Sequence, residues 1–340
     1  MILTVTPNAA LDLTWWVDRI DPGATHRVPS GMARAGGKSL NVARVAHQQG
    51  LSVLAIATAG GTTGAELELE LSGSALPHQL VPVAANTRRS VALYDAANDE
   101  TSIFNEFGAN HSDAEWQALL DAVNAALPRT NCLVGSGSLP AVTPGARDAS
   151  SEFDSSVFYA ELVRGAAARG IPSIIDTSGP GLLAAADAGA TVLKPNRDEL
   201  TAATGISNPI LAARSLVARG TALVLLSLGS AGMIAVTADE PHRYLSARLP
   251  AALTGNPTGA GDAAVAAVAS CFAEAAQRGD GRVPNVEAIL RRATAWSAAA
   301  VLMPLAGEIS PLHSELAERL IVEFHADATS APNPPTENFS

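Results

Sequence analysis

Apolar residues along the chain follow two patterns that alternate. Short runs that are apolar throughout, as in buried strands, lie at 1–6, 52–58, 131–135, 171–176, 191–194, 221–227 and 232–237. Segments with apolar residues at helical spacing lie at 39–49, 63–73, 112–127, 156–169, 208–219, 260–277, 285–303 and 312–325. Strands that are apolar throughout and alternate with helices indicate an α/β fold, with a mostly parallel central sheet flanked by helices.

Two segments break this alternation, at residues 11–32 and 87–107. Both contain patches in which apolar and polar residues alternate singly, together with turn sequences such as Asp-Pro-Gly, a pattern that predicts β-hairpins. Inserted into an α/β body, such hairpins can form a small β-lid over the carboxyl edge of the sheet, where open α/β folds bind ligands. Apolar residues of this lid favour a homodimer that forms through it, and they are Trp15, Trp16, Val91 and Leu93.

The remaining segments predict a simple organisation. We expect one domain over residues 1–325, a polar surface loop at 145–156 and a disordered tail at 326–340. The two cysteines, Cys132 and Cys271, are too few for a disulfide framework and lie in apolar surroundings. Reduced thiols and the lack of a recognisable signal peptide lead us to expect a cytoplasmic protein.

Composition narrows the classes of function. Hydrophobic residues make up 47% of the 340 residues, which is enough for a sizeable core. The formal net charge of -11 argues against a nucleic-acid partner bound by broad phosphate neutralisation. The longest uncharged apolar stretches, 263–273 and 293–306, fall short of the roughly 20 residues that a membrane span needs. Lysine occurs only at Lys38 and Lys194.

The most informative motif is Thr-Gly-Asn-Pro-Thr-Gly-Ala-Gly-Asp-Ala at 254–263, which leads into a predicted helix. Glycines at the start of a helix leave backbone N–H groups uncovered, and the helix dipole makes them an anion site suited to a transferring phosphoryl group. Asp262, in the first helical turn, could accept a proton from an attacking hydroxyl. The simpler alternative is that Asp262 is a favourable first-turn acid and that the glycines only form a turn.

Several motifs, in order, resemble those of the ribokinase-like (PfkB) carbohydrate kinases over about residues 1–320. The run at 259–262 resembles the family's Gly-Ala-Gly-Asp signature, and the run at 36–43 resembles its Gly-Gly-Lys-Gly-Ile-Asn-Val-Ala signature. Further matches lie at 6–12, 135–140, 194–200 and 227–232. The resemblance implies a ribokinase-like fold in which Asp262 is the catalytic base. It also implies an anion hole formed at Gly259, Ala260 and Gly261.

For the sugar side of the site, the resemblance implies three polar contacts. Asp12 accepts hydrogen bonds from sugar hydroxyls, Asn41 donates one, and Arg88 binds the phosphate that the sugar already carries. A planar guanidinium can bind phosphate through two hydrogen bonds. The alternative for Arg88 is a solvated lid arginine, and Arg89 is the weaker candidate for the phosphate. The other implied residues on this side are Gly36, Gly37, Lys38, Asn105 and Ser138.

For the nucleotide side, the resemblance implies that Asn196 and Glu199 organise Mg²⁺, largely through water, beside the triphosphate of ATP. Magnesium keeps its waters and uses few protein oxygens. The local pattern alone indicates a capping box, with Asn196 at the N-cap and Glu199 three residues later, and the two roles can coexist. The other residues implied at ATP are Lys194, Ser227, Gly229, Gly232 and Thr258.

The implied activity is the ATP-dependent phosphorylation of a phosphorylated hexose, with Mg²⁺ as cofactor. The Phe-Asn-Glu run at 104–106 and the Gly-Gly-Lys run at 36–38 are similar to those of the family's 1-phosphofructokinases, which favours fructose 1-phosphate. Phe107 and Ser39 stand where those sequences have proline and glycine. Kinases of tagatose 6-phosphate or fructose 6-phosphate, which share most of these residues, stay alternatives, as does a non-catalytic sugar-phosphate sensor.

Two other nucleotide-binding motifs fail on spacing. The Gly-Lys-Ser run at 37–39 resembles the end of a P-loop, but Met32 stands where that loop needs its first glycine. The Gly-Ser-Gly run at 135–137 continues to Pro140 where a dinucleotide fingerprint needs glycine, and no such fingerprint follows the first strand. The sequence therefore disfavours both a P-loop NTPase and a dinucleotide-dependent dehydrogenase.

Overall fold

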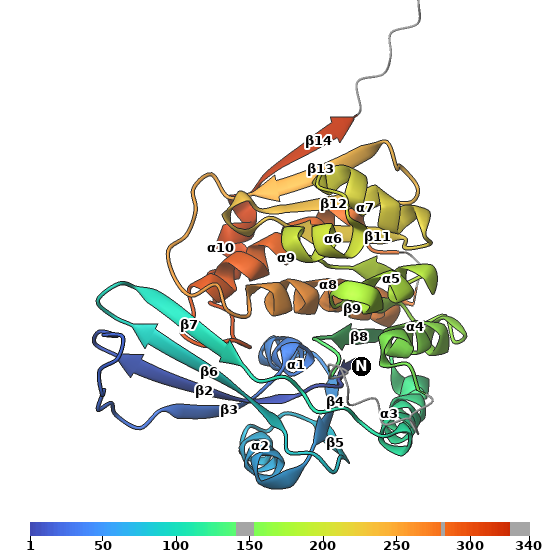
Figure 1. The fold of residues 1–340 in the computed structure, drawn as a ribbon. Helices are drawn as coiled ribbons and strands as arrows, with labels where there is room; N and C mark the ends of the chain where they lie inside the picture. The colour runs from blue at the N-terminus through green and yellow to red at the C-terminus, as the bar shows by residue number, and fades with distance from the viewer. Residues whose placement is uncertain (141–152, 280–282, 327–340) are drawn as a thin grey trace, which may run out of the picture.

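The computed structural model describes residues 1–140, 153–279 and 283–326, and its centre is a ten-stranded sheet (Figure 1). The strand order is β14-β13-β12-β11-β10-β9-β8-β1-β4-β5. The strands from β5 to β11 in this order are parallel: β5 (His78–Pro82), β4 (Val53–Ala59), β1 (Ile2–Thr6), β8 (Cys132–Ser136), β9 (Ser173–Asp176), β10 (Val192–Leu193) and β11 (Leu223–Ser227). Antiparallel pairing then adds β12 (Met233–Thr237), β13 (Arg243–Arg248) and β14 (Ile321–Ala326).

Helices cover both faces of this sheet, because its strands are apolar on both faces. Neighbouring strand residues point to opposite sides, so Leu133 and Val134 belong to two different core clusters. One face is covered by α1 (Lys38–Gln48), α2 (Gly61–Gly73), α8 (Ala260–Arg278), α9 (Val286–Val301) and α10 (His313–Glu318). The other is covered by α3 (Asp113–Ala126), α4 (Phe158–Ala167), α5 (Gly179–Asp187), α6 (Arg197–Thr204) and α7 (Pro209–Ala218).

The lid is a separate four-stranded sheet, which projects from the body beside α1 and α2 (Figure 1). Its order is β3 (Met32–Gly36), β2 (Ala10–Val17), β6 (Arg88–Asp95) and β7 (Glu100–Asn105). The two predicted hairpin segments share this one sheet, because β2 and β6 pair in parallel at its centre. β3 begins only at the end of the first predicted segment, and no strand lies between residues 18 and 31.

One helix prediction is wrong in its second half. The helix expected at 312–325 ends with α10 at Glu318, and the chain then forms the edge strand β14, which pairs with β13. The run Ile-Val-Glu-Phe-His at 321–325 contains β-branched and aromatic residues that favour a strand. The hydrophobic pattern also did not indicate β5, β13 or α5.

Part of the predicted surface loop, 145–152, and the predicted tail from 327 onward lie outside the described residues. Residues 155–157 of that loop form a short 3₁₀ turn. Across the described ranges, every helix is too short or too polar to cross a membrane.

Candidate active site

A cavity of 760 Å³ lies between the carboxyl edge of the parallel sheet and the lid. Its lining comes from residues at or just after the ends of β8, β9, β10 and β11, from the start of α8, and from the inner face of the lid. Most of the predicted site residues line it: Asp12, Gly37, Lys38, Asn41, Arg88, Asn105, Ser138, Lys194, Asn196, Glu199, Ser227, Thr258, Gly259, Gly261 and Asp262.

Four predicted residues do not line the cavity. Gly36 lies behind Asp12, where a Cβ atom would be 2.0 Å from Asp12 Oδ2, so glycine leaves room for that carboxylate. Ala260 is the first residue of α8. Gly229 begins the 3₁₀ turn that follows β11, and Gly232 is the C-cap of this turn. A Cβ at Gly232, whose φ is +93°, would lie 2.1 Å from Ala247 O, so this glycine is required by the turn itself.

The start of α8 is open toward the cavity. Gly259 is its N-cap with a positive φ of 83°, and no side chain caps the helix. A Cβ at Gly259 would lie 2.8 Å from Ala306 Cα, so only glycine lets the segment containing Ala306 pack this closely. The uncapped helix start therefore presents N–H groups and positive dipole potential to the cavity.

Asp262 lies in the first turn of α8 and is almost fully buried. Asn41 Nδ2 donates a hydrogen bond of 2.8 Å to Asp262 Oδ2, which fixes the orientation of the carboxyl group. Burial, with a smaller contribution from the charge of Asp176, raises the pKa of Asp262 to about 7 against the opposing effects of Lys38, Lys194 and the hydrogen bond from Asn41. A carboxyl group with this pKa can both accept and release a proton near neutral pH.

Asp176 is a second buried carboxylate, and sequence reasoning missed it as a site residue. It ends β9 and lies between the two lysines of the chain: Lys38 Nζ is 3.3 Å from Oδ1, and Lys194 Nζ is 3.6 Å from Oδ2. Burial alone would raise the pKa of Asp176, but Lys194 and Lys38 hold it below its ordinary value. An acidic residue at the end of an apolar strand was the available signal.

Lys38 connects this carboxylate to a third one. Its ammonium also lies 3.4 Å from Glu199 Oε1. Burial would lower the pKa of Lys38, but Asp176 and Glu199 outweigh burial and hold the pKa above its ordinary value. Lys38 is therefore a permanent positive charge at the centre of the cavity wall.

The capping box at the start of α6 is present as the sequence indicated. Asn196 Oδ1 accepts a hydrogen bond of 2.8 Å from the Glu199 amide, and Glu199 Oε2 accepts one of 3.0 Å from the Asn196 amide. Both residues line the cavity. The cap fixes Glu199 so that its other oxygen, Oε1, lies toward Lys38.

The lid provides a separate cluster of charges. On its inner face, Asp12 and Arg88 both line the cavity. Burial raises the pKa of Asp12 to about 6, and the guanidinium groups of Arg88, Arg34 and Arg44 oppose that rise. Arg88 Nε donates to Asn8 O at 3.3 Å, which holds the guanidinium beside the cavity. This side can bind hydroxyls and an anionic group together.

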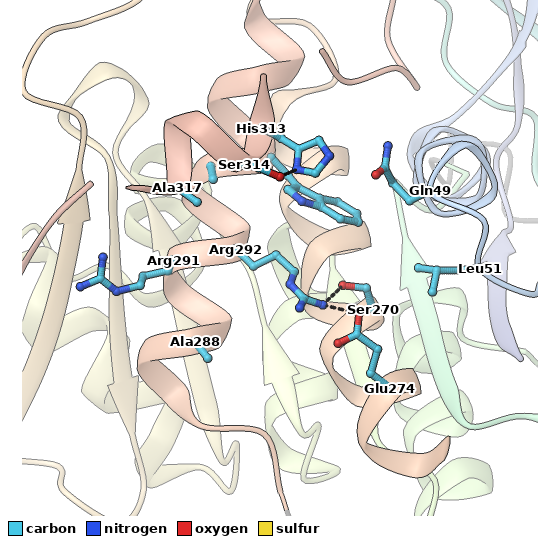
Figure 2. A pocket seen from close by; sticks show the side chains of 12 residues that line it. Gln49, Leu51, Ser270, Glu274, Ala288, Arg291, Arg292, His313, Ser314 and Ala317 are labelled. Carbon is cyan, nitrogen blue, oxygen red and sulfur yellow. Dashed lines mark hydrogen bonds and ion pairs between the residues drawn. The ribbon is translucent and has the colours of Figure 1, made fainter. Parts of the chain in front are cut away.

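Figure 2 shows a second cavity, of 470 Å³, between α8, α9, α10 and the end of α1. Its main charged group is Arg292, whose Nη1 donates to Glu274 Oε1 at 2.6 Å and to Ser270 Oγ at 2.9 Å. The ring of His313 lies edge-on to that of Trp296, with centroids 5.8 Å apart. None of the predicted site residues lines this cavity.

The chain is similar in sequence to a known family and to known proteins. The chain matches the model of the pfkB family of carbohydrate kinases over residues 8–312. It is 35% identical over 306 residues to the 1-phosphofructokinase of Xanthomonas campestris pv. campestris, an alignment that covers 87% of this chain and 89% of the relative. It is 33% identical over 273 residues to the ATP-dependent 6-phosphofructokinase isozyme 2 of Mycobacterium tuberculosis, covering 78% and 76%.

A solved structure has the same fold. Phosphofructokinase-2 from Escherichia coli in complex with potassium aligns with a TM-score of 0.78 and 27% identity, and the alignment covers 94% of this chain and 97% of that one. The expected α/β fold and the expected family are therefore confirmed. The chain belongs to the pfkB family of carbohydrate kinases and is a phosphotransferase that acts on a sugar hydroxyl.

Proposed function

We propose that this enzyme transfers the γ-phosphoryl group of ATP to a hydroxyl of fructose 1-phosphate and so forms fructose 1,6-bisphosphate. The observation that carries the proposal is Asp262, a buried carboxyl group with a pKa of about 7 at the uncapped start of α8. The opposite wall of the same cavity contains Asp12 and Arg88. The identity to a 1-phosphofructokinase and the Phe-Asn-Glu run at 104–106 support the choice of sugar.

In the proposed reaction, Asp262 is the general base. Its carboxylate accepts the proton of the sugar hydroxyl, and the hydroxyl oxygen forms a bond to the γ-phosphorus as the bond to the bridging oxygen of ADP breaks. Asn41 holds Oδ2 of the carboxylate, so that Oδ1 is available to the hydroxyl. The backbone around Gly259, Ala260 and Gly261 stabilises the charge on the transferred group.

For the sugar phosphate, we propose that the lid supplies specificity. Arg88 binds the phosphate with two hydrogen bonds, and Lys38 adds its charge from the opposite wall. Asp12 accepts hydrogen bonds from sugar hydroxyls, and Gly36 leaves the space that this carboxylate occupies. The backbone of Gly37 and the side chains of Asn41, Asn105 and Ser138 complete this half.

For ATP, we propose that Lys194 binds the phosphates. Its Nζ lies 3.3 Å from the point where a Cβ at Gly261 would be, so the ammonium is close to the glycine run at the start of α8. Thr258 and Ser227 line the same side of the cavity, and Asn196 and Glu199 are held there by their mutual cap. Gly229 and Gly232 contribute by shaping the turn after β11.

The residues near Glu199 fit Mg²⁺. Asp176 Oδ2 is a buried oxygen that makes no hydrogen bond within the described residues and lies 3.6 Å from Lys194 Nζ, and Glu199 and Asn196 line the same cavity. We propose that Mg²⁺ enters with ATP and is held by Glu199 and Asn196, largely through water, because magnesium uses few protein oxygens. When bound, the ion neutralises charge on the phosphate oxygens.

We propose that the enzyme is a homodimer formed through the lid. Trp15, Val91 and Leu93 lie on the lid face opposite Asp12, since strand residues alternate and these positions pair across β2 and β6. Phe104 continues this face on β7 and is 61% exposed. Trp16 belongs to the other face.

Light scattering at micromolar concentration tests the dimer. We expect a dimer for the wild type and a monomer for Phe104→Glu, because a charge at the centre of an apolar interface is left without a partner. Phe324→Glu, at a phenylalanine on β14 that is 70% exposed, should leave the dimer intact. A monomeric wild type would refute the proposal.

We also propose that residues 1–325 act as one kinase domain and that the enzyme works in the cytoplasm. The family match over residues 8–312 and the single continuous body sheet support one domain. The two buried thiols, Cys132 and Cys271, are compatible with a reducing compartment.

The deciding experiment is a coupled assay of ADP release with fructose 1-phosphate, fructose 6-phosphate, tagatose 6-phosphate and free fructose. We expect the highest kcat/KM for fructose 1-phosphate and no turnover of free fructose. Fructose 6-phosphate is the second candidate, since the Mycobacterium tuberculosis relative is a 6-phosphofructokinase. ADP release with none of these sugars would refute fructose 1-phosphate as the substrate.

A further inference from the structure

An ion pair joins the lid to the body at a point outside the catalytic cavity. Arg34 Nη1, on lid strand β3, donates to Glu308 Oε1 at 2.9 Å, across 274 positions of sequence. The two side chains are 19% and 30% exposed, so the pair is partly shielded from water. Neither residue lines the cavity.

The segment that contains Glu308 lies against the catalytic residues. A Cβ at Gly259 would be 2.8 Å from Ala306, and a Cβ at Gly307 would be 3.3 Å from Asn41 Oδ1. Asn41 in turn donates to Asp262. Glu308 therefore follows two residues that pack directly against the start of α8 and against the group that orients Asp262.

Arg34 lies beside the sugar-binding end of the lid. In the register of β2 and β3, Arg34 stands opposite Asp12, so both side chains leave the same face of the sheet. The next residue of β3 is anchored separately, because the amide of Ala35 donates to Glu70 Oε2 at 3.1 Å. Glu70 is also paired with Arg44, whose guanidinium donates to Ala35 O. These contacts at Ala35 hold the C-terminal end of β3, next to Arg34, against α1 and α2.

We propose that the Arg34–Glu308 ion pair is a latch that sets the position of the lid over the start of α8. The inference rests on the proposed function, in which the lid holds the sugar phosphate and α8 holds the base. Arg34 and Glu308 are positioning residues: the pair fixes the distance from Asp12 to Asp262 and so aligns the sugar hydroxyl. A small misplacement of reacting groups can lower a rate by about 100-fold.

Charge reversal tests the latch. Arg34→Glu and Glu308→Arg each place like charges at the contact, and we expect each to lower kcat/KM for the sugar phosphate by about 10- to 100-fold. The double variant Arg34→Glu/Glu308→Arg brings opposite charges together again. It should exceed both single variants by about 10-fold, although the loss of the positive charge beside Asp12 keeps it below the wild type.

The KM values for the two substrates distinguish a latch from an ion pair that only stabilises the fold. The latch predicts a large rise in KM for the sugar phosphate and a KM for ATP within about twofold of the wild type. Arg19→Glu is the matched control, since Arg19 forms an exposed pair with Asp21 in the same lid at 3.0 Å. This control should leave both KM values unchanged.

A readout without substrate keeps the latch testable if the proposed sugar is wrong. Spin labels at Ala97→Cys in the lid and Glu318→Cys on α10 report the distance between lid and body, and the two native cysteines are buried. We expect Glu308→Arg to broaden the distance distribution and the double variant to narrow it. Unchanged distributions, or a double variant whose loss is the product of the two single losses, would overturn the latch.

Discussion

The end of β9 and the start of α8 each contain a buried aspartate, and the two carboxyl groups have opposite properties. Asp176 lies between two ammonium groups, which hold its pKa below the ordinary value. Within the described residues, the side-chain amide of Asn41 is the hydrogen-bond partner of Asp262, and burial raises the pKa of Asp262 to about 7. Of the two carboxyl groups in this cavity, Asp176 therefore keeps a fixed negative charge, whereas Asp262 can accept a proton near neutral pH.

This difference shows that burial alone does not decide what a carboxylate does. Both residues are nearly inaccessible to water, and the neighbours set the direction of the pKa change. Neighbouring groups with pKa values displaced in opposite directions are typical of acid–base sites. Asp176 lies between the two lysines for which we propose phosphate binding, and its charge also helps to keep the pKa of Asp262 near neutral.

The largest expected effect comes from removing the base itself. Asp262→Asn keeps the shape of the side chain and abolishes proton acceptance, so we expect kcat to fall by about 10² to 10⁴-fold. ATP binding, measured by calorimetry, should change little. Turnover close to that of the wild type would show that Asp262 is not the base.

Removing the negative charge of Asp176 should have the next largest effect. Asp176→Asn leaves Lys194 and Lys38 without their shared carboxylate, and we expect kcat/KM to fall by about 100-fold through misplaced phosphates. Breaking a buried ion pair should also lower the free energy of unfolding by about 3–5 kcal/mol in a denaturant titration. Asp187→Asn is the control, since Asp187 pairs with Arg219 at the surface. If both variants behave alike, the buried pair has no special role.

The same variant should also change the pH dependence of the reaction. In the wild type, kcat/KM should rise as the pH increases through about 7, because the base must be deprotonated. The charge of Asp176 raises the pKa of Asp262, so Asp176→Asn should move this rise to lower pH. A shift in the opposite direction would contradict the assignment.

Arg88→Ala tests the lid and should act mainly on one substrate. We expect KM for the sugar phosphate to rise by about 10- to 100-fold, since a charged hydrogen bond contributes about 1.5–3 kcal/mol. KM for ATP should stay nearly constant. Arg89→Ala, at the neighbouring lid arginine, is the matched control and should leave both constants unchanged. Equal increases in both KM values for Arg88→Ala would exclude the phosphate-binding role.

The smallest effect is expected at the second cavity. Arg292 is paired with Glu274 between two helices, at a partly exposed site, so Arg292→Gln should change the free energy of unfolding by about 1 kcal/mol or less. Steady-state kinetics should not change. A clear loss of kcat would mean that charges far from the cavity between the lid and the body also control the reaction.

The sequence indicated the local structure at the start of α8 better than it indicated the electrostatics of the cavity. The glycine run before Asp262 is local, so the helix start that follows it could be inferred from neighbouring residues, and the anion site there stays a prediction. The contact between Asn41 and Asp262 spans 221 positions, and only the resemblance to a family indicated that both belong to one site. Asp176 was missed because its position between the two lysines depends on the packing of α1 and of the end of β10 beside β9, and its local signal was only an acidic residue at the end of an apolar strand.

In the fold, too, local sequence patterns predicted individual elements, whereas pairing between segments distant in the chain was not predicted. Apolar strands that alternate with helices predicted the parallel sheet. The edge strand β14 was taken for helix because its apolar residues continue those of α10, and its pairing with β13 joins segments about 80 residues apart in the chain. The predicted lid hairpins likewise merge into one sheet through the parallel pair of β2 and β6.

The most direct measurement is a ¹³C NMR titration of the aspartate carboxyl groups, with Asp262→Asn and Asp176→Asn used to assign the two signals. We expect the Asp262 signal to titrate with a midpoint near 7. The Asp176 signal should stay that of a carboxylate throughout the range in which Asp262 titrates, down to below its ordinary pKa. A midpoint near 4 for Asp262, or titration of both groups together, would contradict the division between a proton acceptor and a fixed charge.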